Sequence, residues 1–443
     1  MTRLPSLLVP AVAAAGLGAI FNGPVAPAPL AEAQALVDLA PAGAVVTLPR
    51  AVYAAPGRGG LRLERAITLD GSGSIIRGVG FDETHGPADA GDRSALVHIA
   101  ASGVHLSNLV VERAPHRGVQ VEGSGNLLQE VVCRDSWSTC IAVLGGADNA
   151  LIHVEAHNSR HGSGIGFGPG DEGGRGHLVL RSVSHDNGRR PDGRKVPPVP
   201  GDPAGGGNSD GMGTGKACSD DFPANACVAY RFVENLVYRN ADDGLDVTVW
   251  DAEVRGNVFW DNGPEGRRGV KMLRNGTALI AGNVAVWHDV GFEARFARPG
   301  RIVHNLALHA SNRGIYGTGA ATAEVVGNVV FLSGGGIRCA AGCTGGTNHD
   351  DPAADPGLAD AALVPALWRY DYPAPTVQAR WAALYERFRQ AYRPQPSSPL
   401  IDAGAVVEGY HCPEPGTGDG ECVEWRGAAP DLGPFEAPLP APR

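Results

Sequence analysis

The sequence is poor in charge, because Asp, Glu, Lys and Arg make up only 19% of its 443 residues, and the formal net charge is −10. A chain without a basic excess gives no reason to expect nucleic acid as a partner. An anionic substrate remains open, since charge at a site can oppose the charge of the whole molecule. Low charge combined with 63 glycines and 34 prolines is typical of a β-rich chain with many tight turns.

Long apolar runs are also lacking beyond the N-terminus, so no membrane span is expected in the mature protein. Residues 1–29 contain one basic residue, Arg3, followed by an apolar run. This pattern predicts a signal peptide and therefore a secreted, extracellular protein.

Zinc-ribbon spacing is absent among the cysteines, which argues against a metal–thiolate site. The eight cysteines instead fall into four short-range couples, an arrangement that predicts disulfides in an oxidising compartment. The couples are Cys133/Cys140, Cys218/Cys227, Cys339/Cys343 and Cys412/Cys422.

Two markers repeat with a period of about 22 residues between residues 96 and 338. The first is a short apolar stretch led by a small or polar residue, and it starts at Gly118, Cys140, Gly164, Gly211, Gly244, Gly269, Gly291, Gly314 and Gly336. The second is an asparagine followed by apolar residues, at positions Asn235, Asn257, Asn283, Asn305 and Asn328. We expect these asparagines to stack as a ladder of side-chain amides.

Two markers with one period predict stacked coils of about three short strands each, which is an all-β, right-handed parallel β-helix. A β-sandwich or propeller with accidental spacing is the alternative.

Two of the intervals between successive markers are longer than the period because they hold insertions, roughly residues 188–208 and 216–225. Both insertions flank a stretch rich in acidic residues, 208–275. Long loops on one side of a regular scaffold are typical of binding regions.

The segments before and after the repeat are predicted to cover the two ends of the solenoid. Apolar residues at helical spacing predict a helix over 30–39 that covers the open N-terminal edge of the solenoid. The repeat fades after Cys343, and residues 379–388 have a helical pattern. The predicted division is therefore a signal peptide over 1–29, a β-helix catalytic domain over 30–343, and a C-terminal cap segment over 344–443 packed on the β-helix.

Acids and one lysine gather between residues 208 and 275 at related positions of the repeat. When the coils are aligned on their leading glycines, alternation within each strand turns Met212, Leu245, Val270 and Phe292 inward. The same alternation turns Asp246, Lys271 and Glu293 outward in one column. Asp210 and Asp243 form a second column, with Asp242 directly before it. A single aspartate of this kind usually only caps a turn, and a lone exposed lysine is usually only solvated.

Several carboxylates from neighbouring coils repel one another unless a cation lies among them. Carboxylate oxygens on a rigid sheet suit calcium, a hard cation that takes six to eight oxygen ligands. A cation beside this lysine lowers the pKa of its amine, whereas Asp246 raises it. A lysine with these two opposed neighbours can accept a proton.

The sequences Asn-Ser-Asp-Gly (208–211), Ala-Asp-Asp-Gly-Leu-Asp-Val (241–247) and Gly-Val-Lys (269–271) resemble the calcium-dependent pectate lyases of polysaccharide lyase family nine. The resemblance covers about residues 100–340. It implies a secreted lyase that cleaves 4-linked polygalacturonate, an anionic polysaccharide, by β-elimination, and we expect it to act as a monomer. Carried over by position, Lys271 is implied as the catalytic base and Ca²⁺ as the cofactor. The implied calcium ligands are Asp210, Asp242, Asp243 and Asp246.

Other residues on the same face are candidates for substrate contacts, namely Arg268, Arg274, Glu293, Arg295 and Trp250. Trp250 is equally well explained by covering an outer strand. Two other functions remain open. An inverting polygalacturonase-like hydrolase also uses paired acids, although no Gly-His-Gly follows on the next coil. A non-catalytic carbohydrate-binding or adhesin β-helix would form no unsaturated product.

Overall fold

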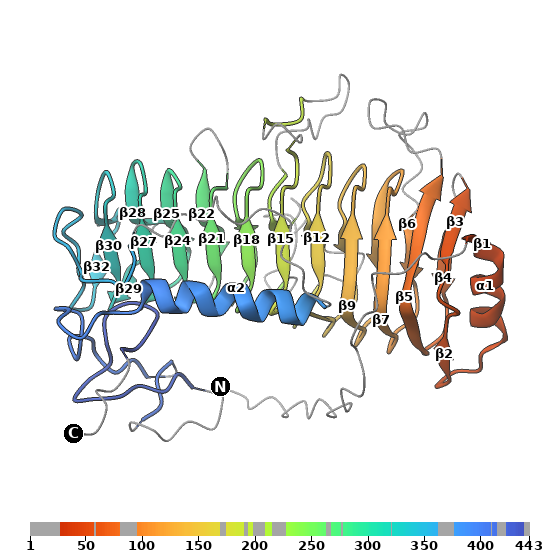
Figure 1. Ribbon diagram of the computed structural model, residues 1–443. Coiled ribbons are helices and arrows are strands. Elements are labelled where there is room, and N and C mark those ends of the chain that lie inside the picture. The colour runs from red at the N-terminus through yellow and green to blue at the C-terminus, as the bar shows by residue number, and fades with distance from the viewer. Residues whose placement is uncertain are drawn as a thin grey trace.

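The coils stack in chain order along one axis, from the N-terminal strands at one end of the molecule to β32 at the other (Figure 1). Every pairing between the named strands is parallel, as expected for a solenoid in which each strand meets its counterpart one coil away. This is a right-handed parallel β-helix, as predicted. The computed structural model describes residues 27–56, 59–79, 95–168, 174–189, 194–197, 209–214, 227–262, 267–275, 278–319, 321–361, 376–408, 410–413 and 422–437.

One face of the solenoid is an eleven-stranded sheet that carries the predicted site. Its strands are β4 (Leu61–Leu63), β6 (Ala95–Ile99), β8 (Arg117–Val121), β10 (Ile141–Val143), β13 (Ile165–Phe167), β16 (Met212–Thr214), β19 (Leu245–Val247), β22 (Arg268–Asn275), β25 (Val290–Phe296), β28 (Arg313–Gly319) and β31 (Ile337–Cys339).

The other faces form one continuous 21-stranded sheet, because the long strands β5, β7 and β9 bend from one face to the next. Its strands are β1 (Pro27–Pro29), β2 (Val45–Thr47), β3 (Val52–Pro56), β5 (Thr68–Val79), β7 (His105–Glu112), β9 (Leu127–Arg134), β11 (Ala150–Ile152), β12 (Glu155–His157), β14 (Leu178–Leu180), β15 (Val183–His185), β17 (Arg231–Val233), β18 (Leu236–Tyr238), β20 (Glu253–Arg255), β21 (Val258–Trp260), β23 (Leu279–Ala281), β24 (Val284–Val286), β26 (Gly300–Val303), β27 (Leu306–Leu308), β29 (Ala323–Val326), β30 (Val329–Phe331) and β32 (Cys343–Thr344).

Inward side chains from all faces meet in one apolar core that runs the length of the solenoid. The four residues predicted to point inward at the site belong to it and are at most 1% exposed: Met212, Leu245, Val270 and Phe292. Their strands are therefore held in one register, since a shift by one residue would replace these side chains by glycines or by Asp246, Lys271 and Glu293.

The predicted asparagine ladder is confirmed. Each amide nitrogen donates to the amide oxygen one coil further on, from Asn235 to Asn257 and onward to Asn328, at 2.9–3.0 Å. The ladder continues to Asn348. The residue before each rung adopts a left-handed conformation, for example Glu234 (φ 52°) and Gly256 (φ 67°). This conformation turns the chain sharply, and the amide then satisfies backbone groups inside the turn.

Replacing a central rung is expected to destabilise the solenoid strongly. Asn257 donates to Asn283 and to the carbonyl of Phe232, and it accepts from the backbone and side chain of Asn235. Asn257→Ala leaves these buried groups unpaired, so the free energy of unfolding should fall by about 3 kcal/mol or more. Urea denaturation measures the loss, and exposed Asn312→Ala is the control. A change below about 0.5 kcal/mol, the range of ordinary surface substitutions, would contradict the ladder's role.

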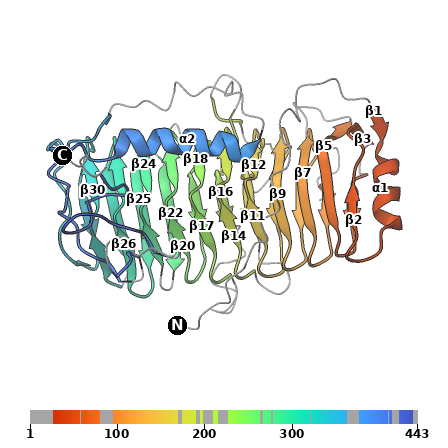
Figure 2. The ribbon, with the colours of Figure 1, turned by 60° about the horizontal axis from the view of Figure 1, so that its bottom comes forward.

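Two helices flank the coils. Helix α1 (Leu30–Leu39) covers the N-terminal end beside β1, β3 and β4, where Leu30, Ala33 and Val37 are buried (Figure 2). Its bounds are those predicted for the N-terminal cap. Helix α2 (Val377–Tyr392) includes the segment predicted as helical and lies along the flank of the solenoid, across many coils (Figure 1).

Helix α2 is held on the solenoid by apolar packing and by polar contacts at specific points. Trp381 and Phe388 pack in one apolar cluster with outward side chains such as Trp260. The Glu130 carboxylate accepts hydrogen bonds from the first backbone N–H groups of the helix, at 2.7 and 3.0 Å, where the helix dipole favours a negative charge. Arg380 forms an ion pair with the buried carboxylate of Glu155.

The contribution of Glu155 to stability is expected to depend on pH. Burial alone would raise the pKa of Glu155, but the hydrogen bond from His185 and the charges of His157 and Arg380 outweigh it and lower the pKa to about 2. Because the folded-state pKa lies below the usual 4.5, this stabilisation is present above pH 4.5 and is lost as the pH falls towards 2.

Glu155→Gln should therefore lower the free energy of unfolding by about 3 kcal/mol at pH 7, the scale for breaking a buried ion pair. The difference from the wild type should shrink below pH 4.5. Urea midpoints at pH 7, 5 and 3 test this dependence. Glu324→Gln, which removes a half-exposed pair with Arg301, is the control and should have a smaller effect that does not change with pH between 7 and 5. A Glu155 effect that is constant with pH would contradict the assignment.

The cysteine predictions have mixed outcomes. Disulfides Cys339–Cys343 and Cys412–Cys422 are present. Cys227 is disulfide-bonded, while its predicted partner Cys218 lies outside the described residues. The prediction for Cys133 and Cys140 is wrong, because both are free and buried. Each thiol instead contacts the other residue's backbone carbonyl, at 3.2 and 3.3 Å, within the core.

Several predictions concern residues that the structure does not describe. The signal peptide lies almost wholly outside the described residues, as do most of the two insertions. The domain boundaries at residues 29 and 343 stay a prediction. Among the helices described, none is both long and apolar enough to cross a lipid bilayer.

Candidate functional site

The predicted outward column exists on the eleven-stranded sheet. Across β16, β19, β22 and β25 (three of them labelled in Figure 2), Gly213 pairs with Asp246, Asp246 with Lys271, and Lys271 with Glu293. Adjacent parallel strands lie about 4.8 Å apart. The repeat therefore places an acid, a base and a second acid on three successive coils.

Three carboxylates converge beside this column. One oxygen each from Asp210, Asp243 and Asp246 lie within 4.8 Å of one another. Asp210 and Asp243 come from the turns that lead into β16 and β19, and the backbone N–H of Asp243 donates to the Asp210 carboxylate at 3.1 Å. Asp243 is 1% exposed, whereas the side chain of Asp246 is 23% exposed. The group is thus buried at its base and open towards solvent at Asp246.

Lys271 closes the open side of this group. Its Nζ lies 2.6 Å from Asp246 and 3.4 Å from Asp243, and its side chain is 22% exposed. Burial alone would lower the pKa of Lys271, but the neighbouring charges of Asp246, Asp243 and Asp210 outweigh burial and raise it. The amine is therefore held in its charged form while these carboxylates are not neutralised.

Crowding also acts on the acids. Burial, followed by the charges of Asp246, Asp243 and Asp242, raises the pKa of Asp210 well above its usual value. Burial raises the pKa of Asp246 as well, against the opposing charge of Lys271. Like charges in a buried site raise each other's pKa in this way. A bound cation would relieve the repulsion.

Asp242 lies next to the group but points to a different partner. Its carboxylate forms an ion pair with Arg267 at 3.0 Å, and it is not among the three acids that converge. Burial and the charge of Asp243 raise the pKa of Asp242 to about 6. Its role as a fourth ligand stays a prediction.

Arg268, on the same strand as Lys271, forms a pair with Glu293 on the next coil. The Arg268 guanidinium donates to Glu293 at 2.6 Å, and the backbone N–H of Arg268 donates to Asp243 at 2.8 Å. Glu293, which the family pattern does not include, thus fixes the side chain of Arg268 beside the acid group.

A second polar ladder supports the acidic turn, and the sequence did not reveal it. The amide of Asn187 donates to Asn240 at 2.8 Å, Asn240 donates to Asn262 at 2.9 Å, and Asn262 contacts His288 at 3.2 Å. Asn240 begins the turn that carries Asp242 and Asp243. The spacing of 22 residues from Asn240 to Asn262 was a usable signal, but the insertion before Asn240 and the histidine at its end obscured the series.

The remaining candidates lie outside the acid group. Arg295 is exposed on β25, two residues beyond Glu293. Trp250 is partly exposed, and the Arg298 guanidinium lies 5.4 Å from the centre of its ring. The side chain of Arg274 and all of Asn208 lie outside the part of the chain that is described.

The donor set fits a hard divalent cation. It consists of carboxylate oxygens only, which calcium prefers. Asp243 Oδ2 is buried and has no hydrogen-bond partner, apart from the Lys271 charge at 3.4 Å. An acceptor in this position is suited to a metal ion, because burying it unpaired is costly. Asp210, Asp243 and Asp246 are therefore the residues that could hold calcium.

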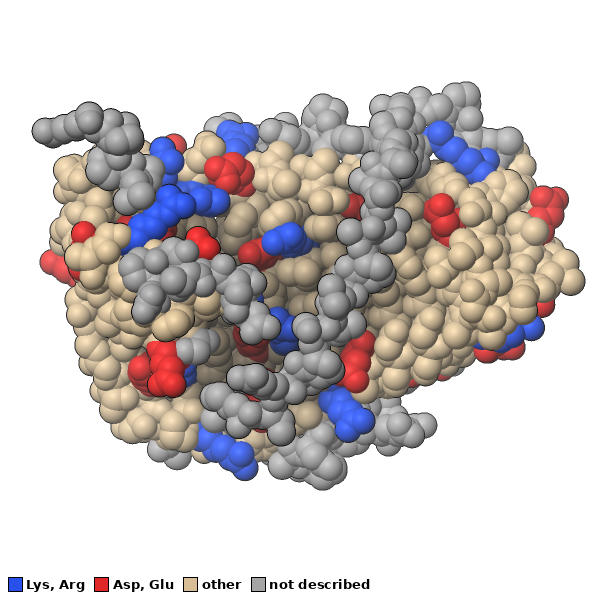
Figure 3. All heavy atoms as spheres, turned by 90° about the horizontal axis from the view of Figure 1, so that it is seen from below, with Lys and Arg blue, Asp and Glu red and all other residues tan. Residues whose placement is uncertain are grey.

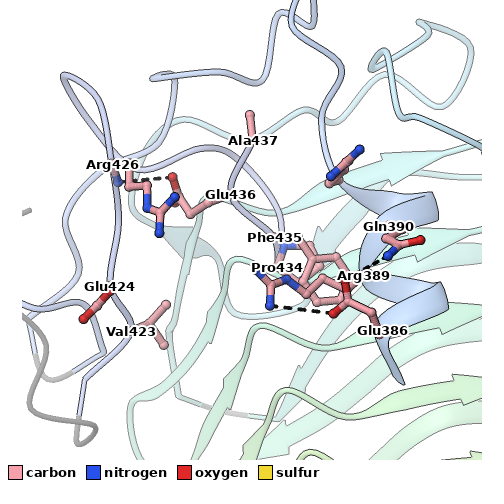
Figure 4. A pocket seen from close by; sticks show the side chains of 11 residues that line it. Glu386, Arg389, Gln390, Val423, Glu424, Arg426, Pro434, Phe435, Glu436 and Ala437 are labelled. Carbon is pink, nitrogen blue, oxygen red and sulfur yellow. Dashed lines mark hydrogen bonds and ion pairs between the residues drawn. The ribbon is translucent and has the colours of Figure 1, made fainter. Parts of the chain in front are cut away.

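A hollow elsewhere on the molecule does not involve these residues. It has a volume of about 310 Å³ and lies between the C-terminal end of α2 and residues 423–437 (Figure 4). Glu386 and Arg389 on one side and Glu436 on the other line it. Figure 3 shows acidic and basic side chains next to each other on the face of the molecule that is seen from below in Figure 1.

The fold and this group define a class: a parallel β-helix with converging carboxylates and a lysine on the outer face of one sheet. No protein-family model matches the chain, and no curated protein matches it. Among solved structures, it is similar to pectate lyase Pel9A, with 17% sequence identity over 91% of this chain and 90% of that chain, and a TM-score of 0.58. This likeness shows the fold.

Further solved structures with some similarity include a rhamnogalacturonan lyase, at 14% identity over 78% of this chain and 88% of that one, with a TM-score of 0.46. The A-module of the mannuronan C-5 epimerase AlgE4 from Azotobacter vinelandii has 14% identity over 72% and 90% of the two chains, with a TM-score of 0.43.

Proposed function

We propose that the chain is a secreted polysaccharide lyase that cleaves 4-linked polygalacturonate (pectate) by β-elimination, with calcium as cofactor. The observation that carries this proposal is the Lys271 amine, 2.6 Å from Asp246, at the open edge of a group of three carboxylates. A base beside a site for a divalent cation is what proton removal next to a carboxylate requires.

Asp210, Asp243 and Asp246 would hold the calcium ion, with Asp242 as the fourth ligand that the family pattern implies. Bound there, calcium would withdraw charge from the uronate carboxylate and stabilise the negative charge that develops during the reaction. Arg268, Arg274, Arg295 and Trp250 are proposed to contact neighbouring sugars, with Glu293 holding Arg268 in place.

Lys271 has one chemical task in this scheme. Its uncharged Nζ takes the proton from C5 of the sugar, next to the carboxylate. The electron pair of that C–H bond forms the C4=C5 double bond, and the C4–O bond breaks. The glycosidic oxygen leaves with the bonding pair and takes a proton from water. Because the carboxylates around Lys271 raise its pKa, they must be neutralised before the amine can act as a base.

The spacing of the acids disfavours an inverting hydrolase. Inverting enzymes keep their two carboxyl groups about 6.5–9.5 Å apart to leave room for the attacking water. Oxygens of the three converging carboxylates lie within 4.8 Å of one another. A non-catalytic carbohydrate-binding β-helix remains distinguishable by experiment.

The test is ultraviolet absorbance of the unsaturated product with polygalacturonate, in calcium and after chelation. We expect product in calcium, none after chelation, and recovery when calcium is restored. New reducing ends without absorbance would indicate a hydrolase, and no cleavage at all would indicate a binding protein. Alginate as a parallel substrate tests whether the enzyme accepts another polyuronate.

A further inference from the structure

The outward column continues beyond the proposed site towards the C-terminal end of the solenoid. Glu293 pairs with Tyr316 on β28, and Tyr316 pairs with Arg338 on β31. Arg338 therefore lies three coils from Lys271, roughly 14 Å along the axis. The three positions on the N-terminal side of the acids are Gly213, Gly166 and Ala142, which carry no charge. Near the site, the column offers cations to a long anionic substrate only on the C-terminal side.

Arg313 stands next to this column and contacts it. Its guanidinium lies 4.8 Å from the centre of the Tyr316 ring, and both side chains are partly exposed. A guanidinium packed on an aromatic face is held in position while its N–H groups stay available for a carboxylate. The ring and the charge thus form one preorganised surface two coils beyond Lys271.

The two arginines differ from Arg231 and Arg301, which lie on another face of the solenoid. Arg231 and Arg301 form ion pairs with Glu253 and Glu324 at 3.0 and 2.7 Å. Within the residues that the structure describes, no carboxylate forms an ion pair with Arg313, and Arg338, which is exposed, has none either. Two arginines without an ion-pair partner, in line with the site, are available to carboxylates of an anion from outside, although the net charge of the chain is −10.

We propose that Arg313, Tyr316 and Arg338 form an accessory binding strip for a polyuronate. The strip binds carboxylates of sugars that lie two and three coils beyond the bond to be cleaved, and Tyr316 packs against a sugar ring. The inference rests on the proposed function for its substrate class. It assigns a direction to binding, since the polymer extends from the acid group towards β31.

Because the strip lies far from the reacting atoms, it should increase the affinity for long chains without changing the rate of the chemical step. In the double variant Arg313→Ala/Arg338→Ala, KM for polygalacturonate should rise about tenfold, with kcat changed less than about twofold. Kinetics on di- and trisaccharides, which do not reach the strip, should be unchanged. Arg313→Lys should retain part of the affinity, since it keeps the charge but loses the fork of N–H groups.

The control is Arg62→Ala/Arg231→Ala, which removes the same charge elsewhere. Arg62 lies in the same outward column at the far N-terminal end, on β4. An unchanged KM for the polymer in the strip variant, or an equal change for short and long substrates, would overturn the inference. So would an equal loss in the control.

A second readout separates this inference from the proposed function. Mobility in gels that contain polygalacturonate measures binding without turnover. If the wild-type protein forms no product yet is retarded, and the strip variant alone loses retardation, the lyase assignment fails while the strip stands. If product forms and the gel retards the wild-type protein and the strip variant equally, the inferred binding strip is wrong while the lyase assignment holds.

Discussion

Lys271→Ala is expected to lower the rate of elimination on polygalacturonate by about 10²- to 10⁴-fold, the usual contribution of a positioned general base. Calcium affinity should stay the same or increase, because the substitution removes a positive charge that lies 2.6 Å from Asp246. Product absorbance gives the rate, and calorimetric titration with calcium gives the affinity.

Lys271→Arg distinguishes proton transfer from charge. Arginine keeps the positive charge beside Asp243 and Asp246 but cannot give up its proton at accessible pH. We expect this variant to be about as inactive as the alanine variant. If Lys271→Arg retains activity, the side chain only supplies a positive charge and is not the base. If Lys271→Ala retains activity, the whole assignment is wrong.

The sequence predicted the register of the site because each coil starts with the same short pattern. Gly244 and Gly269 mark equivalent points on neighbouring coils, so counting two residues onward placed Asp246 beside Lys271, and the structure pairs these residues. The prediction needed only strand alternation and the parallel stacking of coils.

Contacts that depend on packing between distant segments were not predictable in this way. Nothing in the local pattern pairs Arg380 of α2 with Glu155, which lies 225 residues earlier. Cys133 and Cys140 are close in sequence, yet both stay free in the core, where each thiol contacts a backbone carbonyl. The ion pair between Asp242 and Arg267 likewise joins two turns whose side-chain directions no periodicity specifies.

Asp243→Asn should weaken the response to calcium without damaging the fold. Asp243 is the most buried of the converging acids and is linked to both others, through the Asp210 hydrogen bond and through Lys271, which it shares with Asp246. Losing its charge should weaken calcium binding by about tenfold or more, and lyase activity should fall with it. The amide keeps the shape and one acceptor oxygen for the backbone N–H of Arg268.

The sign of the stability change makes this prediction specific. Without calcium, the three carboxylates repel one another: burial is the main cause of the raised pKa of Asp210, and the charges of Asp246 and Asp243 add to it. Removing one charge should therefore leave the melting temperature of the calcium-free protein unchanged or slightly higher. The increase in melting temperature on adding calcium should shrink, since stabilisation by a ligand follows its affinity. Exposed Asp148→Asn, which removes the same charge from another coil, should keep the full calcium response. A calcium-free Asp243→Asn protein that melts well below the wild type, with its calcium response intact, would show that Asp243 only stabilises the turn.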